Sequence, residues 1–74
     1  MSAEAPTATE IAAHYAASLD SVTLITELMA LSSRDADQTA TVARNVEHLQ
    51  LMVAKTYWTS EDLAPLNAAI TAGS

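Results

Sequence analysis

The sequence contains no cysteine and no phenylalanine, one glycine, two prolines and only three basic residues among 74. Without cysteine, a disulfide framework and thiolate chemistry are excluded. A single glycine cannot build a glycine-rich phosphate-binding loop. Three scattered cations, Arg34, Arg44 and Lys55, are too few to neutralise the phosphates of a nucleic acid or the headgroups of an anionic membrane. We therefore expect no direct nucleic-acid contact and no membrane partner.

Signals for export and membrane insertion are also missing from the sequence. Residues 1–6 have no basic region followed by an apolar core, so we expect no secretion by a signal peptide. No uncharged apolar run approaches the roughly 18 residues that a bilayer-spanning helix needs. The expected location is the inside of a cell, or a particle assembled there.

The apolar composition favours helices. Half of the residues are apolar, and 16 of them are alanine, the strongest helix former. The larger apolar residues recur at spacings of three and four rather than two, which indicates helix rather than strand. We predict one all-α domain over residues 1–74, with helices at about 8–31, 36–56 and 62–72. The first two are expected to form an antiparallel hairpin, with the short third helix packed across it.

Capping signals support the starts of the first two helices. Thr7 and Glu10 fit a capping box, in which the two side chains satisfy free backbone N–H groups. Either Asp35 or Asp37 can cap the second helix. The sequence leaves open whether Asp20-Ser21 interrupts the first helix.

The third helix is predicted from Asp62 as its cap. That start would place Pro65 in the first turn, where its missing N–H does no harm. Gly73 then suits the C-terminal cap.

Each predicted helix has an inner apolar stripe, and the first helix has a second one. The inner stripes are Ile11, Tyr15, Ser18, Val22, Ile25 and Met29, then Val42, Val46, Leu49 and Val53, then Leu63, Leu66 and Ile70. The second stripe of the first helix is Leu24, Leu28 and Leu31. Because a hairpin covers only one side of that helix, we expect the core to be completed by an oligomer or by a larger partner.

Residues with chemical potential do not form a recognisable catalytic or metal site. Glu10 and His14 share a helix face, but two ligands are too few for a typical zinc site. Ser18 lies near His14, but no strained nucleophile turn or oxyanion loop accompanies the pair. We therefore predict no enzyme, metal, cofactor or small-molecule substrate, and a small catalyst using His14 or His48 is the weakest of three hypotheses.

The outer face of the second helix is the more informative feature. Arg44, Glu47, Leu51, Lys55 and Trp58 lie opposite its inner stripe and include two of the three basic residues and the only tryptophan. Tryptophan and arginine are enriched at interface hot spots, which predicts a protein-binding surface. The alternative is that Trp58 folds back under the third helix and leaves Leu51 as a lone exposed apolar side chain.

Part of the sequence resembles a known group of proteins. The segment Arg44-Asn45-Val46-Glu47-His48-Leu49-Gln50-Leu51-Met52, followed by Ala54-Lys55, Trp58 and Glu61-Asp62-Leu63-x-Pro65, is similar to a pattern in short uncharacterised proteins of tailed bacteriophages encoded near structural genes. The resemblance covers the C-terminal third to half and includes no mechanistic motif. It implies a small virion component, such as a capsid decoration, connector or tail accessory protein, located in the virion or the host cytoplasm.

The leading hypothesis is a non-catalytic structural or assembly protein that packs against copies of itself or against larger virion subunits. Its expected contacts are Leu24, Leu28, Leu31, Arg44, Glu47, Leu51, Lys55 and Trp58. The alternative is an acidic regulatory binder that modulates a basic partner protein, because nine acidic residues against three basic ones give a net charge of −6. Opposite charge would steer such a partner toward the chain.

Overall fold

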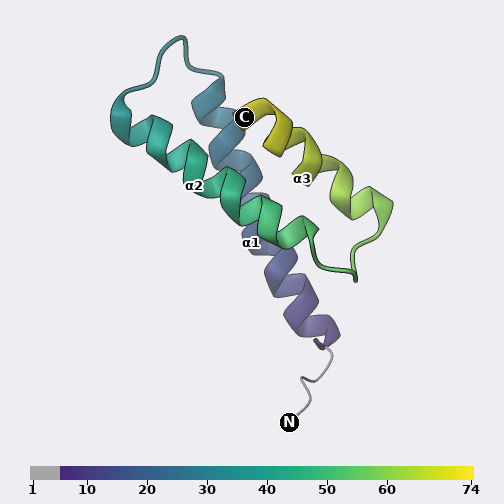
Figure 1. The fold of residues 1–74 in the computed structure, drawn as a ribbon. Helices are drawn as coiled ribbons and strands as arrows, with labels where there is room; N and C mark the ends of the chain where they lie inside the picture. Colours follow the sequence, from purple (N-terminus) through teal and green to yellow (C-terminus); the bar gives the residue numbers. More distant parts are fainter. Residues whose placement is uncertain (1–5) are drawn as a thin grey trace.

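A computed structural model describes residues 6–74, which form three α-helices and no strand. They are α1 (Ala8–Met29), α2 (Ala36–Val53) and α3 (Ser60–Gly73), as Figure 1 shows. The all-α prediction is confirmed over this range. The expectation that there is no signal peptide concerns residues 1–6, and residues 1–5 of this segment lie outside the described residues.

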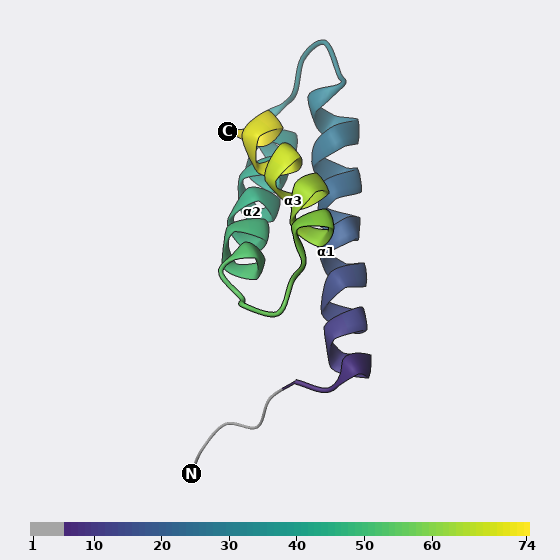
Figure 2. The ribbon, with the colours of Figure 1, turned by 90° about the vertical axis from the view of Figure 1, so that its right-hand side faces the viewer.

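The three helices run up, down and up as a bundle in which each helix contacts both others (Figures 1 and 2). The Tyr15 hydroxyl of α1 donates to the Asp62 carbonyl at the start of α3, at 3.2 Å. At the other end of α3, Gly73 lies beside Ile25 of α1. These two contacts make α1 and α3 parallel, so α3 lies lengthwise along the α1–α2 hairpin rather than across it.

The predicted inner stripes face one another in the core. Its buried apolar side chains are Ile25, Val42, Val46, Leu49, Met52, Trp58, Leu66 and Ala69. Ile11, Tyr15, Val22, Met29, Val53, Leu63 and Ile70 pack partly buried against them, together with Leu28 and Tyr57. The spacing of three and four therefore identified the core-facing side of each helix. Leu28, expected on an outer stripe, is half-buried because it also touches this core.

Every helix begins with a capping box, in which the cap side chain and the residue three positions later bond each other's backbone N–H. The pairs are Thr7 with Glu10, Asp35 with Gln38, and Thr59 with Asp62. Asp35 rather than Asp37 therefore caps α2. The pKa of Glu10 is lowered, first because its carboxylate accepts the Thr7 backbone N–H.

The predicted start of the third helix was wrong. Thr59, not Asp62, is the cap, and Asp62 is its partner three residues into the motif. Pro65 consequently stands in the second turn of α3 and not in the first. A proline there removes one backbone hydrogen bond to the residue four positions earlier, Glu61. Glu61 is exposed, so water can reach its carbonyl.

The first helix is continuous through Asp20 and Ser21. Ser21 does not break it because its hydroxyl bonds across to α2 instead of competing for the local backbone. The helix ends at Met29, two residues earlier than predicted. Beyond that end, Arg34 Nη1 donates to the carbonyls of Leu28, at 3.2 Å, and Leu31, at 3.1 Å. A cation that bonds these carbonyls suits the negative end of the helix dipole.

Gly73 is needed for close packing and not for a left-handed cap, so that interpretation is corrected. It is the last residue of α3, and no glycine among residues 6–74 has a positive φ. A Cβ at Gly73 would lie 2.6 Å from Val46 Cγ2 and 3.2 Å from Ile25 Cγ2. Both neighbours are β-branched side chains with little rotamer freedom. The C-terminal turn of α3 thus reaches α1 and α2 only because it has no side chain here.

We predict that Gly73→Ala lowers the free energy of unfolding by about 1–3 kcal/mol, because the new methyl group overpacks the contact with Val46. Val46→Ala removes the Cγ2 methyl group that would lie 2.6 Å from the new Cβ. In the Val46→Ala background, Gly73→Ala should therefore cost much less, because only the 3.2 Å contacts with Ile25 and Val42 remain. Chemical denaturation of the four proteins of this cycle measures the coupling. Additive effects of the two substitutions would contradict the steric explanation.

Candidate functional site

A polar contact lies in the middle of the seam between α1 and α2. The Ser21 hydroxyl is 2.8 Å from Asn45 Oδ1 and 2.8 Å from His48 Nδ1. Asn45 Nδ2 donates to the Thr41 carbonyl at 2.8 Å, which orients the amide so that its oxygen faces Ser21. A serine hydroxyl has one proton to donate. Ser21 therefore donates to Asn45 and accepts from His48, so His48 carries a proton on Nδ1.

This direction of the hydrogen bonds sets the role of the contact. A histidine that activates a serine nucleophile must accept the serine proton, whereas His48 donates to Ser21. Ser21 is also buried beneath the seam. The contact satisfies three polar side chains between two packed helices, and it fixes the register of α1 against α2.

The register places the two predicted outer stripes side by side. Leu24 and Leu28 continue the Ser21 side of α1 at spacings of three and four, and Leu31 follows two residues beyond the end of α1. At 100° per residue this side faces away from Tyr15, whose hydroxyl bonds α3. The structure therefore puts Leu24 and Leu28 toward the flank of the hairpin that α3 does not cover. Leu24 is 42% exposed and Leu31 is 43% exposed.

On α2 the adjoining stripe runs from Arg44 through His48 to Leu51, and Lys55 continues its spacing two residues beyond the end of the helix. It lies opposite Val46, which faces Gly73 of α3. Leu51 is the most exposed of the large apolar residues, at 64%. Arg44, Glu47, His48 and Leu51 line a shallow depression of about 360 Å³. We call the α1 leucines and this α2 stripe with Glu47 the hairpin face.

Trp58 does not belong to the hairpin face, and this part of the predicted surface is corrected. It is only 9% exposed, and its indole N–H donates to the Met52 carbonyl at 2.7 Å. Its ring packs edge-on against Tyr57, with centroids 4.5 Å apart, and lies 5.4 Å from the Tyr15 ring. Trp58 therefore folds back into the bundle, as the alternative interpretation of the sequence expected.

The burial of Trp58 also explains why α2 ends at Val53 and not near Thr56. The Met52 carbonyl accepts from Trp58 and from the Lys55 backbone N–H, so the chain turns instead of continuing the helix. A buried indole needs an acceptor, and the free carbonyls at a helix end supply one. The sequence signal for the end of α2 was therefore Trp58 itself, which lies five residues beyond Val53, the last valine of the inner stripe.

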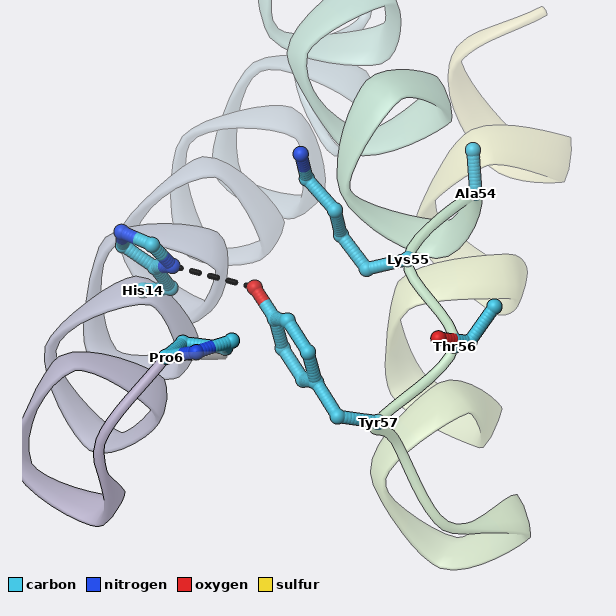
Figure 3. Close-up of a pocket in the computed structure, with 6 residues that line it drawn as sticks. All are labelled: Pro6, His14, Ala54, Lys55, Thr56 and Tyr57. Atoms are coloured by element: carbon cyan, nitrogen blue, oxygen red, sulfur yellow. Dashed lines mark hydrogen bonds between the residues drawn. The ribbon is translucent and has the colours of Figure 1, made fainter. Parts of the chain in front are cut away.

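A second hollow, of about 470 Å³, lies between the start of α1 and the α2–α3 loop (Figure 3). Its lining residues are Pro6, His14, Ala54, Lys55, Thr56 and Tyr57. His14 Nδ1 and the Tyr57 hydroxyl are 3.0 Å apart across it. The 43-residue separation hid this pair from sequence reasoning. Because the two groups bond each other at an exposed position, the contact ties the loop to α1.

The Glu10–His14 pair gains no further ligand in the fold. Within residues 6–74, the structure brings together no group of three or more histidine and acidic side chains suited to a metal ion. In the same part of the chain, no helix is both long enough and apolar enough to cross a membrane. Comparisons with protein-family models, curated proteins and solved structures gave no match.

The seam makes a prediction about the tautomer of His48. The neutral ring should carry its proton on Nδ1, which ¹⁵N chemical shifts of the ring distinguish from the Nε2–H form. Ser21→Ala should remove this preference and lower the free energy of unfolding by about 1–2 kcal/mol, because Asn45 and His48 lose a partner. Thr23→Ala, an exposed change on the same helix, is the control. An Nε2–H ring in the wild-type protein would overturn the assigned bond directions.

Proposed function

We propose that this chain is a non-catalytic assembly protein that works by packing its hairpin face against copies of itself or against larger subunits. The observation that supports this is the exposure of Leu24 and Leu51 on the flank of the hairpin opposite α3, and of Leu31 beyond the end of α1. Single exposed leucines are ordinary on protein surfaces. Here they lie on two adjoining stripes, next to a depression lined by arginine, glutamate and histidine.

The amino-acid composition of the chain makes the exposure of these leucines significant. With 16 alanines and no phenylalanine, the chain has few large apolar side chains for its core. It nevertheless leaves Leu24 and Leu31 more than 40% exposed and Leu51 64% exposed. An apolar stripe flanked by charged residues is the usual composition of a protein-binding surface, in which the charges form the rim.

A tailed-phage particle is the setting we propose for this assembly. The support is the resemblance of segment 44–65 to short phage proteins encoded near structural genes. In that setting the protein is a virion component such as a capsid decoration, a connector or a tail accessory protein. Quantitative mass spectrometry of purified particles should then find the chain at a fixed stoichiometry. Reproducible absence from particles would contradict the virion setting while leaving self-assembly intact.

An acidic regulatory binder is the second candidate. Its support is the net charge of −6 together with the exposure of acidic side chains at helix ends, among them Asp35, Asp37 and Glu61. In this case the chain would stay monomeric alone and would associate only with a basic partner.

Sedimentation velocity over a hundredfold concentration range tests the first proposal. The wild-type chain should form a discrete oligomer, and Leu51→Asp should shift it to monomer because a carboxylate would be desolvated in the contact. Gln50→Asp is the matched control, since it adds the same charge at an exposed α2 position about 100° away around the helix. A wild-type monomer at every concentration would contradict self-assembly and favour the acidic binder.

A further inference from the structure

The side of α2 that faces away from Val46 has a regular pattern, most of which the three-helix bundle leaves exposed. Asp37, Thr41, Arg44, His48, Leu51 and Lys55 recur at spacings of four, three, four, three and four. This is the spacing at which the facing residues of two packed helices recur. Only Leu51 of the six is apolar, and Lys55 lies two residues beyond the end of α2. None of the six is buried within the bundle, and Asp37, Arg44, Leu51 and Lys55 are exposed. His48 is bonded to Ser21 of α1, so α1 borders the stripe on one side, and the exposed members Asp37, Arg44, Leu51 and Lys55 remain available to a partner.

The charges along the stripe have opposite signs at its two ends. Asp37 lies in the first turn of α2, and Lys55 follows its last turn. A parallel partner copy in register would place aspartate against aspartate, Arg44 against Arg44 and lysine against lysine. Each of these like-charge contacts is destabilising. The stripe therefore disfavours parallel pairing of two copies.

Antiparallel pairing gives the opposite result. When all six positions face each other, Asp37 meets Lys55 of the partner subunit, and Thr41 meets Leu51 of the partner subunit. Arg44 then meets His48 of the partner subunit and lies one position from Glu47 of the partner subunit. If one α2 helix slides along the other by seven residues in one direction, Arg44 faces Lys55 of the partner subunit, which is a like-charge contact. The same shift in the other direction leaves Leu51 and Lys55 without a facing stripe position.

The local charge balance also favours a second copy as the occupant. The chain as a whole has a net charge of −6, which opposes self-association. The stripe with Glu47, however, contains two carboxylates and two of the chain's three basic side chains. Two copies that meet along it bring balanced charge together, whereas a strongly basic partner would meet Arg44 and Lys55.

We infer that two copies of this chain pair through α2, antiparallel about a two-fold axis level with residue 46 on the side of α2 away from α3, with Asp37 of each copy facing Lys55 of the partner subunit. This inference rests on the proposed function and specifies its partner and geometry. The two Asp–Lys pairs lie at the ends of the contact. The Thr41–Leu51 contacts lie between them and remove Leu51 from water.

A charge exchange tests the pairing on the intact chain by sedimentation velocity. Asp37→Lys alone creates two lysine–lysine contacts across the dimer, and Lys55→Asp alone creates two aspartate–aspartate contacts. Each single variant should weaken dimerisation by about tenfold, since two attractive pairs become repulsive. An equimolar mixture of the two variants should recover wild-type affinity to within about threefold, because both ends of their heterodimer again pair one lysine with one aspartate.

Glu61→Lys is the matched control. Glu61 is exposed at the second position of α3, as Asp37 is at the second position of α2, so the change in charge and in helix capping is the same. It should not weaken dimerisation, and far-UV circular dichroism should show all variants folded. A variant that failed to fold would not regain dimerisation when it is mixed with the other variant. Recovery in the mixture would therefore exclude a folding defect as the cause of the weaker dimerisation.

The outcomes separate this inference from the function on which it rests. A wild-type monomer at all concentrations overturns both. Self-association that Leu51→Asp abolishes but the charge variants leave unchanged overturns the antiparallel register and retains the assembly function. Single variants that weaken dimerisation without recovery in the mixture also overturn the pairing. Weakening followed by recovery supports it.

Discussion

The close approach of α3 to the other two helices is the constraint on which the rest of the structure depends. The last turn of α3 touches Val46 and Ile25 through Gly73, where a single Cβ would overlap Val46. The core contains no phenylalanine, and Ala69 is the only alanine among the buried side chains of residues 6–74, so the close approach at Gly73 is needed to bring α3 against Ile25 and Val46. Leu24 and Leu31 stay outside this core, at 42% and 43% exposure.

The polar seam converts this packing into a defined surface. Ser21, Asn45 and His48 satisfy one another only when α1 and α2 are in one register, because each bond is directional. A slip by one turn would leave these groups unpaired between the helices. The same register sets the α1 leucines beside the stripe that contains Arg44 and Leu51. A contact in the interior of the hairpin thus determines which side chains lie together on its exterior.

Local patterns in the sequence predicted the elements, and tertiary contacts decided what the patterns missed. The inner stripes and the Thr7–Glu10 capping box depend on residues three or four apart, so they could be predicted from the sequence. The start of α3 was misplaced because Asp62 can serve either as a cap or as the third residue of a box that begins at Thr59. Trp58 and Gly73 were misassigned for another reason, since the Met52 carbonyl and the Val46 methyl group that decide their roles depend on the fold.

The charge of the chain bears on both proposed functions through its distribution. An acidic chain resists meeting another copy of itself, and that resistance acts over a Debye length of about 8–10 Å. If two copies touch only along a charge-balanced stripe, the side chains that come closest carry charges of both signs. The other carboxylates of each copy stay farther away, where salt screens their repulsion. Arg44 and Lys55 offset the charges of Asp37 and Glu47 at the contact. With two of its three cations on one helix face, the chain has a surface on which apolar contact between copies does not have to overcome its full net charge.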